Sequence, residues 1–267
     1  MEHCKIIAVG DNVCDKYLSR GKMYPGGQCV NTCVYVKMNN MESAYLGKYG
    51  DDEVAACVQD TLKEIGIDDS HCRRYEGENG FALVTLKETD RVFLGSNKGG
   101  IAKEHDFGFT KEDLEYIKGF HLIYTNLNSY IEKELPVLYY TGVPVAYDFS
   151  KRLEQESNDE IIPYLDYAFF SYDRDDEYIR NFMVKTNEKG AKTVVAMLGE
   201  YGSLAYENGK FYKLDAEKVE VVNTVGAGDS YIAAFTYGVS LGEDIMQCMR
   251  RGRQRATEII QQFNPYK

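Results

Sequence analysis

Residues 223–229, Asn-Thr-Val-Gly-Ala-Gly-Asp, constrain this chain more than any other stretch. The β-branched run Val219–Val222 predicts a strand before them, and small residues with amphipathic spacing from Ser230 onward predict a helix after them. Glycines flanking one alanine predict a tight turn, which leaves the N–H groups of residues 226–229 unpaired at the start of the helix. Because these amides and the helix dipole both favour negative charge, the sequence predicts an anion-binding site here.

The last residue of the motif, Asp229, is a carboxylate placed inside this predicted anion site. There it can take a proton from a hydroxyl group while the amides of Gly226, Ala227 and Gly228 stabilise charge on a transferring phosphoryl group. The alternative interpretation is an ordinary strand-to-helix turn in which Asp229 only caps the helix. The sharper hypothesis is phosphoryl transfer to a hydroxyl group.

Strand and helix patterns alternate along the rest of the chain. This order predicts βαβ units, a parallel sheet, and ligands at the C-terminal ends of its strands. We expect strands at 6–9, 44–48, 121–125, 143–148, 167–171 and 193–198, and helices at 28–38, 52–65, 111–117, 132–140 and 176–189. The sequence therefore predicts an α/β fold.

Two stretches break the alternation. Residues 13–24 are short and polar, and residues 81–86 with 91–94 predict a hairpin. Both fit a small β lid that lies outside the main sheet. Because no internal repeat or linker divides the chain, we expect residues 1–267 to form a single domain.

Bulk properties narrow the classes of protein. The chain has 267 residues with 31 basic and 42 acidic side chains, and its net charge of −11 argues against a nucleic-acid partner. We expect no membrane segment, since no apolar run approaches the ~20 residues of a span, and no signal peptide. Seven cysteines without a Cys-x-x-Cys motif predict reduced thiols and a cytoplasmic protein.

The motif at residues 223–229 resembles the Asp-Thr-x-Gly-Ala-Gly-Asp signature of the ribokinase-like (pfkB) carbohydrate kinase family, with Asn223 in place of the first aspartate. The resemblance implies an ATP-dependent sugar kinase in which Asp229 is the catalytic base and Gly226, Ala227 and Gly228 form the anion hole. It also implies a three-layer α/β/α fold with a mostly parallel central sheet, and a small β-sheet lid formed by segments of about 13–24 and 81–98.

Two constellations resemble the sugar-binding residues of this family. Asp11 ends the first predicted strand, where an aspartate can hydrogen-bond a ligand hydroxyl; the alternative is a turn-forming Asp-Asn pair. Gly26, Gly27 and Asn31 match a Gly-Gly-x-x-x-Asn substrate motif, in which paired glycines let the backbone approach a ligand. The resemblance implies that these residues hold the sugar.

The resemblance also implies a nucleotide site. The turn Gly199-x-x-Gly202 follows a buried strand and is similar to a family turn beneath the nucleotide phosphates and ribose. Further expected nucleotide-binding residues are Thr224, Gly226, Gly228, Gly252, which is small enough to border an adenine, and Asn264, which ends the last helix. The phosphoryl donor is expected to be ATP. Mg²⁺ is expected with it, because ATP binds to such kinases as its magnesium complex and so brings the ion. Metal ligands stay unassigned, since the family's Asn-x-x-Glu is missing near residues 171–177.

Within the family, several pieces are similar to the fructoselysine 6-kinases: Gly10-Asp-Asn12, Asp90-Arg-Val-Phe93, Asp148-Phe-Ser150 and the turn at 198–203. This similarity implies phosphorylation of the primary 6-hydroxyl of a ketose-type fructosamine such as fructoselysine. Such a substrate carries a secondary ammonium and a carboxylate. Arg91 on the lid is a candidate partner for the carboxylate, and the alternative is a solvated charge on a strand.

Two other functions stay open. One is a kinase of the same fold that acts on another hexose, ribose or a nucleoside. The other is a catalytically weak relative that binds sugar or nucleotide, which Asn223 and the missing Asn-x-x-Glu leave possible. The small-molecule sugar is the expected partner, with no nucleic acid and no membrane. We also expect a homodimer joined through the lids, because an uncovered lid would expose its strand edges and alternating apolar residues.

Overall fold

The computed structural model describes residues 4–39, 41–87, 90–154 and 156–262. Within them, the main sheet has nine strands in the order β13-β12-β11-β10-β9-β8-β1-β4-β5, and its strands are parallel except that β12 pairs antiparallel with both β11 and β13 at one edge. Their bounds are β1 (Lys5–Gly10), β4 (Glu42–Tyr49), β5 (Arg73–Arg74), β8 (Leu122–Asn126), β9 (Val145–Asp148), β10 (Tyr167–Ser171), β11 (Thr193–Met197), β12 (Ser203–Glu207) and β13 (Lys210–Leu214).

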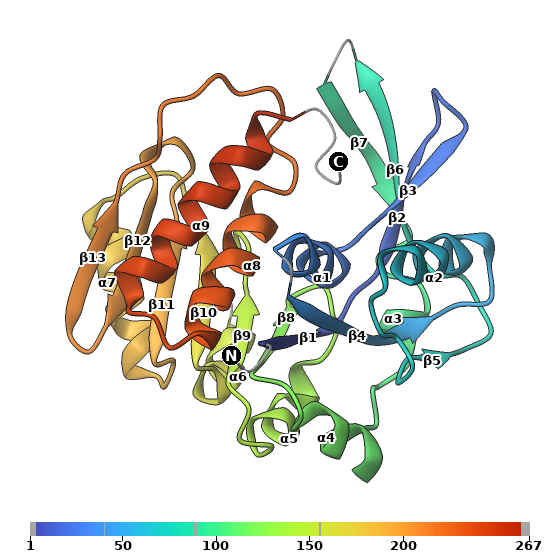
Figure 1. Ribbon diagram of the computed structural model, residues 1–267, viewed down its shortest axis with the longest axis horizontal. Coiled ribbons are helices and arrows are strands. Elements are labelled where there is room, and N and C mark those ends of the chain that lie inside the picture. The colour runs from blue at the N-terminus through green and yellow to red at the C-terminus, as the bar shows by residue number, and fades with distance from the viewer. Residues whose placement is uncertain (1–3, 40, 88–89, 155, 263–267) are drawn as a thin grey trace.

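Helices cover both faces of this sheet (Figure 1). One face packs against α1 (Gln28–Met38), α2 (Glu53–Ile65), α8 (Ala227–Ser240) and α9 (Ile245–Ile260). The other face packs against α4 (Lys111–Ile117), α5 (Leu135–Tyr139), α6 (Glu156–Ile161) and α7 (Glu177–Glu188). The predicted three-layer α/β/α arrangement is therefore confirmed.

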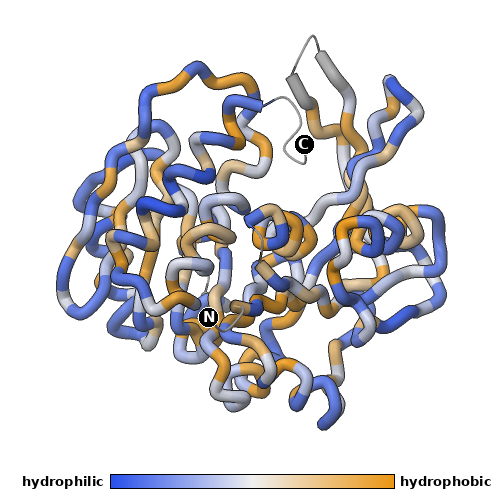
Figure 2. The backbone as a smooth tube through the Cα atoms, in the orientation of Figure 1, coloured by the Kyte–Doolittle hydropathy of each residue, from blue (hydrophilic) through white to orange (hydrophobic). Residues whose placement is uncertain are grey.

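Both faces of the central strands are apolar because both are covered. In β1, Ile6 and Ala8 belong to the core beneath α1 and α8, whereas Ile7 and Val9 belong to the opposite core. This alternation is the two-residue period of a strand, and burial on both faces is typical of parallel sheets. Figure 2 shows the same pattern, with hydrophobic backbone segments gathered in the centre and hydrophilic ones along the outer loops.

The second sheet has four strands in the order β3-β2-β6-β7 and projects away from the main sheet (Figure 1). Its strands are β2 (Val13–Tyr17), β3 (Lys22–Gly26), β6 (Gly80–Lys87) and β7 (Asp90–Ser96). Both segments predicted to form a lid lie in this sheet. Its inner face packs on α2, where Cys14 of β2 is fully buried. We call this second sheet the lid.

Local signals explain where the helices begin. The carboxylate of Asp52 accepts a hydrogen bond of 3.0 Å from the Ala55 amide and caps α2, which ends at Gly66 in a left-handed conformation.

The strand predicted at Val219–Val222 is wrong. The main sheet already ends at β13, and the Val222 amide instead donates to the Ile260 carbonyl at the end of α9. The β-branched residues therefore lie in an exposed connection.

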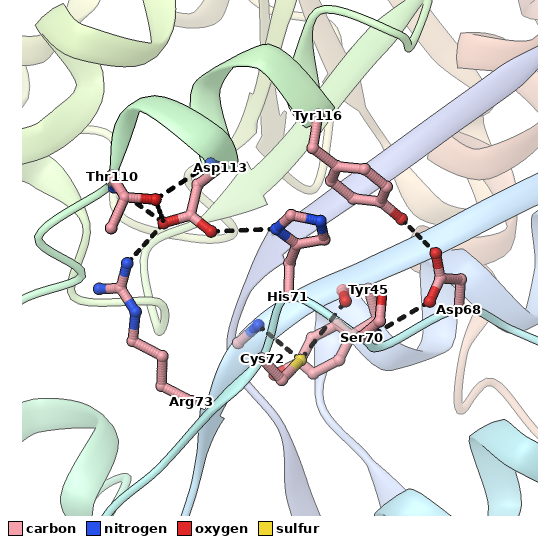
Figure 3. A network of polar contacts seen from close by, with 10 residues as sticks. Tyr45, Asp68, Ser70, His71, Cys72, Arg73, Thr110, Asp113 and Tyr116 are labelled. Carbon is pink, nitrogen blue, oxygen red and sulfur yellow. Dashed lines mark hydrogen bonds and ion pairs between the residues drawn. The ribbon is translucent and has the colours of Figure 1, made fainter.

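A polar network fixes the outer edge of the main sheet (Figure 3). Asp113 of α4 accepts hydrogen bonds from Thr110 and from Arg73 of β5, and its carboxylate lies 3.1 Å from His71 Nδ1. Burial works to raise the pKa of Asp113, but these hydrogen bonds together with Arg73 hold it below the ordinary value. The network therefore contains an ionised carboxylate that ties α4 to the edge strand.

All seven cysteines are free thiols. In the described part of the chain, no helix combines the length and apolar character needed to cross a bilayer.

Candidate active site

A pocket of about 1200 Å³ lies between the lid, the start of α1 and the connection before α8. From the lid it is lined by Asp15, Tyr17 and Tyr24, which we call the lid wall. From the main body it is lined by Asp11, the Gly26-Gly27 turn, Asn31 and residues 221–226. The pocket thus brings together the predicted sugar motifs and the start of the Gly-Ala-Gly-Asp motif.

Asp11 holds the N-terminus of α1. Its Oδ2 accepts the Gln28 amide at 2.9 Å, and its Oδ1 accepts the Cys29 amide at 3.0 Å and Asn126 Nδ2 at 2.6 Å. Gly27 precedes the helix with φ +98°, and a Cβ there would lie 2.9 Å from Asp11 Oδ2. Only glycine therefore allows this close approach. Asp11 lies at the pocket wall, as expected, and also caps a helix that begins 17 residues later.

Asn31 and Asp229 meet across the site. The Asn31 side-chain amide donates to Asp229 Oδ2 at 2.6 Å, which joins the first turn of α1 to the first turn of α8. Burial raises the pKa of Asp229 to about 6, and the nearby charge of Asp11 acts in the same direction. Hydrogen bonds from Asn31 and Gln28 oppose this shift. The pKa of Asp229 therefore lies close to neutral pH, which suits a general base.

Gln28, which the sequence did not single out as a site residue, connects two further polar groups. Its Nε2 donates to Asp148 Oδ2, and its Oε1 accepts Asn128 Nδ2 at 2.9 Å. Asp148 is only 3% exposed, and burial raises its pKa to about 7, although the Ser150 amide and Gln28 stabilise its charge. The strand-end motif at 148–150 signalled Asp148, whereas nothing local signalled Gln28.

The turn before α8 is ordered by its own side chains. Asn223 Oδ1 accepts the Val225 amide at 3.0 Å, and the Ala227 amide donates to the Thr224 carbonyl at 3.2 Å. The Ala227 amide is thus engaged within the turn, contrary to the expectation of a free donor. Gly226 has φ +80°, and a Cβ there would lie 2.2 Å from the Tyr35 hydroxyl. Glycine is required at 226 for both reasons.

The predicted nucleotide residues lie in two places. Gly199 and Gly202, with φ of +59° and +88°, bound a 3-10 turn directly after β11. A Cβ added at Gly228 would lie 3.8 Å from Cε of Met197, the last residue of β11. Gly228 therefore lies beside the end of this strand. The turn and the start of α8 are therefore neighbours. Thr224 is exposed and lines the pocket.

The predicted contacts of three other residues with nucleotide or substrate stay untested. Gly252 is buried in α9, and a Cβ there would lie 2.8 Å from the Tyr231 ring of α8. The structure thus gives Gly252 a packing role, and its adenine contact stays a prediction. Asn264 lies outside the described residues. Arg91 pairs with Leu86 in the β6–β7 register, and its side chain is outside the described part.

No protein metal cage is found in the part of the chain that the structure describes, where no group of three or more His, Cys, Asp or Glu side chains is arranged to hold a metal ion. The acidic stretch after β10 has other partners. Asp175 pairs with Arg180 and Lys213, and Asp176 caps α7 by accepting the Ile179 amide at 2.9 Å. These carboxylates are engaged in holding α7 and β13.

Sequence comparison identifies related proteins. A model of the pfkB family carbohydrate kinases matches residues 4–267. Fructosamine kinase FrlD of Bacillus subtilis is 37% identical over 257 residues, which cover 95% of this chain and 90% of that protein. Fructoselysine 6-kinase of Escherichia coli K12 is 32% identical over 256 residues, which cover 96% of this chain and 97% of that protein.

Solved structures share the fold. A ribokinase of Arabidopsis thaliana complexed with ribose and ATP has a TM-score of 0.87 at 19% identity, covering 100% of this chain and 95% of that chain. A ribokinase II of Escherichia coli in complex with ATP and Mg²⁺ has a TM-score of 0.82 at 16% identity, covering 98% and 94%. The predicted ribokinase-like fold is confirmed. By sequence and by architecture the chain belongs to the pfkB family of carbohydrate kinases, and it is an ATP-dependent phosphotransferase acting on a sugar hydroxyl.

Proposed function

We propose that this kinase transfers the γ-phosphoryl group of ATP to the primary 6-hydroxyl of a fructosamine, such as fructoselysine. The two relatives at 37% and 32% identity, named fructosamine kinase and fructoselysine 6-kinase, support this substrate class. The observation that carries the proposal is the Asn31–Asp229 hydrogen bond, which sets a base with a raised pKa beside a pocket large enough for a sugar adduct.

In the proposed reaction, Asp229 takes the proton of the sugar hydroxyl as its oxygen attacks the γ-phosphorus. The bond from phosphorus to the β-bridging oxygen breaks and ADP leaves, while the proton passes from Asp229 to water. The amides of Gly228 and Asp229 and the dipole of α8 stabilise the transferring group. Asp11, Gly26, Gly27 and Asn31 are assigned to the sugar.

The lid wall supports a cationic substrate. Asp15 of β2 lies directly opposite Tyr24 of β3 in the strand register, and Tyr24 packs edge-on against Tyr17 with ring centroids 5.4 Å apart. A carboxylate beside aromatic rings favours a substituted ammonium through ion pairing and cation–π attraction. A fructosamine has such an ammonium at C1, whereas fructose has a neutral hydroxyl there.

We assign the nucleotide to the side formed by Gly199, Gly202, Thr224 and the start of α8, with Gly252 behind it. Because the described residues show no protein metal cage, Mg²⁺ would be held mainly by phosphate oxygens and water, as is usual for this ion with nucleotides. When bound, it would neutralise charge on the β- and γ-phosphates. The cytoplasmic location stays a prediction.

A substrate panel tests the function. We expect kcat/KM for fructoselysine to exceed that for fructose by about 10²- to 10⁴-fold, because a charge-assisted contact contributes roughly 1.5–3 kcal/mol and free fructose lacks two of them. ADP release would be measured with fructoselysine, fructose, ribose and adenosine. Equal use of fructose or ribose would instead identify a general sugar kinase, and preference for adenosine would identify a nucleoside kinase.

Replacement of the base tests the chemistry. Asp229→Asn should keep the fold, since an amide can occupy the same space, and should lower kcat by about 10²- to 10⁴-fold. Steady-state kinetics with circular dichroism as the folding control would measure this. Glu115→Gln, a change of the same size on the exposed face of α4, should leave kcat unaltered. Near-normal turnover of Asp229→Asn would remove Asp229 from the role of base.

The pH profile tests the contact between Asn31 and Asp229. The acid limb of kcat/KM should lie near pH 6, because activity needs Asp229 ionised and is lost as pH falls through its pKa. Asn31 stabilises the charged form, so Asn31→Ala should move this limb to higher pH. Asn31→Asp should move it further, because a second negative charge opposes ionisation. An unmoved limb in both variants would contradict this coupling.

We also propose that the protein forms a homodimer through the lids. Leu18, Phe93 and Leu94 are each more than half exposed on the lid, where β3 and β7 leave free edges. Light scattering at micromolar concentration should report a dimer, and Leu94→Asp should convert it to a monomer. The matched change Val137→Asp, at an exposed apolar residue of α5, should not. A monomeric wild-type protein would exclude the lid dimer.

A further inference from the structure

Lys98 is a basic residue of the pocket that neither the sequence motifs nor the proposed chemistry uses. It lies in the short connection between β7 and α3 (Ile101–Glu104) and lines the pocket together with Asp15 and Tyr24. Its side chain is exposed, and within residues 4–39, 41–87, 90–154 and 156–262 its ammonium forms no ion pair. The contacts that hold Lys98 all involve its backbone.

The backbone of Lys98 is strained and is held in that state. Lys98 has φ +56°, a left-handed conformation that is uncommon for a lysine and costs of order 1–3 kcal/mol. The Tyr130 hydroxyl donates to the Lys98 carbonyl at 2.7 Å, and the Lys98 amide donates to Ser96 Oγ at 3.2 Å. Tyr130 is itself left-handed, with φ +51°. Two strained residues therefore fix each other at the pocket.

The Tyr130 ring limits the space around this loop. A Cβ at Gly99 would lie 2.8 Å from the Tyr130 ring, so this ring packs directly on the backbone after Lys98. A turn that needed only to reverse direction would be satisfied by glycine or asparagine at position 98. A lysine at this position places a flexible, positively charged side chain on the pocket lining.

The described lining of the pocket carries charges of both signs. Asp11 and Asp15 supply carboxylates, and Lys98 and the exposed Arg20 supply positive charge from the loops of the lid. A fructosamine also carries both signs, with its secondary ammonium next to the sugar and a carboxylate on the amino-acid portion beyond it. The lining therefore offers a counter-charge for each of these groups.

We propose that Lys98 binds the carboxylate of the amino-acid portion of the substrate, a role that rests on the fructosamine kinase function proposed above. The ammonium of Lys98 forms a charge-assisted hydrogen bond with this carboxylate, while Tyr130 keeps the Lys98 backbone in place. Lys98 is thus a specificity-determining residue. It acts on substrate binding and takes no part in proton or phosphoryl transfer.

The test compares two substrates that differ only in the carboxylate: fructosyl-lysine and fructosyl-cadaverine, its decarboxylated counterpart. Lys98→Met should lower kcat/KM for fructosyl-lysine by about 10- to 100-fold, the usual effect of one charge-assisted contact. The same variant should change kcat/KM for fructosyl-cadaverine by less than about 3-fold, because that substrate never makes the contact. Lys98→Arg should retain most of the preference.

Two controls separate this role from a structural one. Lys103→Met removes an exposed lysine of α3 that does not line the pocket, and it should change neither substrate. Lys98→Gly relieves the left-handed strain, so its melting temperature should equal or exceed that of the wild type while the preference for the carboxylate is lost. If Lys98 had only a structural role, Lys98→Gly would have a lower melting temperature than the wild type and would keep the preference for the carboxylate.

The outcomes distinguish this inference from the function on which it rests. If the wild type prefers both adducts over fructose but treats them alike, the fructosamine function stands and the role of Lys98 is overturned. Equal losses on both adducts in Lys98→Met would overturn it as well. If fructose is used as well as either adduct, the proposed function fails and the Lys98 role fails with it.

Discussion

The hydrogen bond between the Asn31 amide and the Asp229 carboxylate joins the N-terminal turns of α1 and α8, and the geometry of the site depends on it. Two helix N-termini meet there, and each attracts negative charge. Asp11 accepts the first amides of α1, and Asp229 lies in the first turn of α8. The site therefore gathers carboxylates that would otherwise repel one another, and a set of side-chain amides supplies the donors that make this possible.

Burial and hydrogen-bond donors together set the pKa values of Asp148 and Asp229. Burial is the main cause of their raised pKa values of about 7 and 6, since removing water disfavours the charged form. Hydrogen bonds from the Ser150 amide and Gln28 to Asp148, and from Asn31 and Gln28 to Asp229, oppose this shift. The proton affinity of each carboxylate thus depends on the balance between its burial and the donors that it receives.

The two sides of the pocket have separate tasks. The body side contains the charged and amide groups that the chemistry needs, and they are fixed by hydrogen bonds to helices and strands. The lid wall contains Asp15 with aromatic rings, and the loop after β7 adds Lys98. Because the lid is a separate sheet, its side chains can differ without disturbing the proposed base and anion site. Substrate choice is therefore expected to be encoded in the lid.

Local sequence signals predicted the features that depend on near neighbours. The helix predicted at 52–65, found as α2, and the turn at Gly226 follow from residues within a few positions. The contact between Gln28 and Asp148 spans 120 residues and has no local signal. The valines at 219–222 have strand propensity, but the main sheet ends at β13 and gives them no place. The left-handed backbone of Lys98 depends on Tyr130, 32 residues away.

The family signature has an aspartate where this chain has Asn223. The effect of a charge at this position on the pKa of Asp229 offers a physical explanation for the difference. Asn223 Oδ1 accepts the Val225 amide and so orders the turn before α8, a task that the oxygen of an aspartate performs equally well. An aspartate, however, would add negative charge to a pocket lined by Asp11, Asp15 and Asn31, the hydrogen-bond partner of Asp229. That charge would raise the pKa of Asp229 further and leave less of this proposed base ionised at neutral pH. Asparagine keeps the turn without this effect, so its presence is compatible with an active kinase.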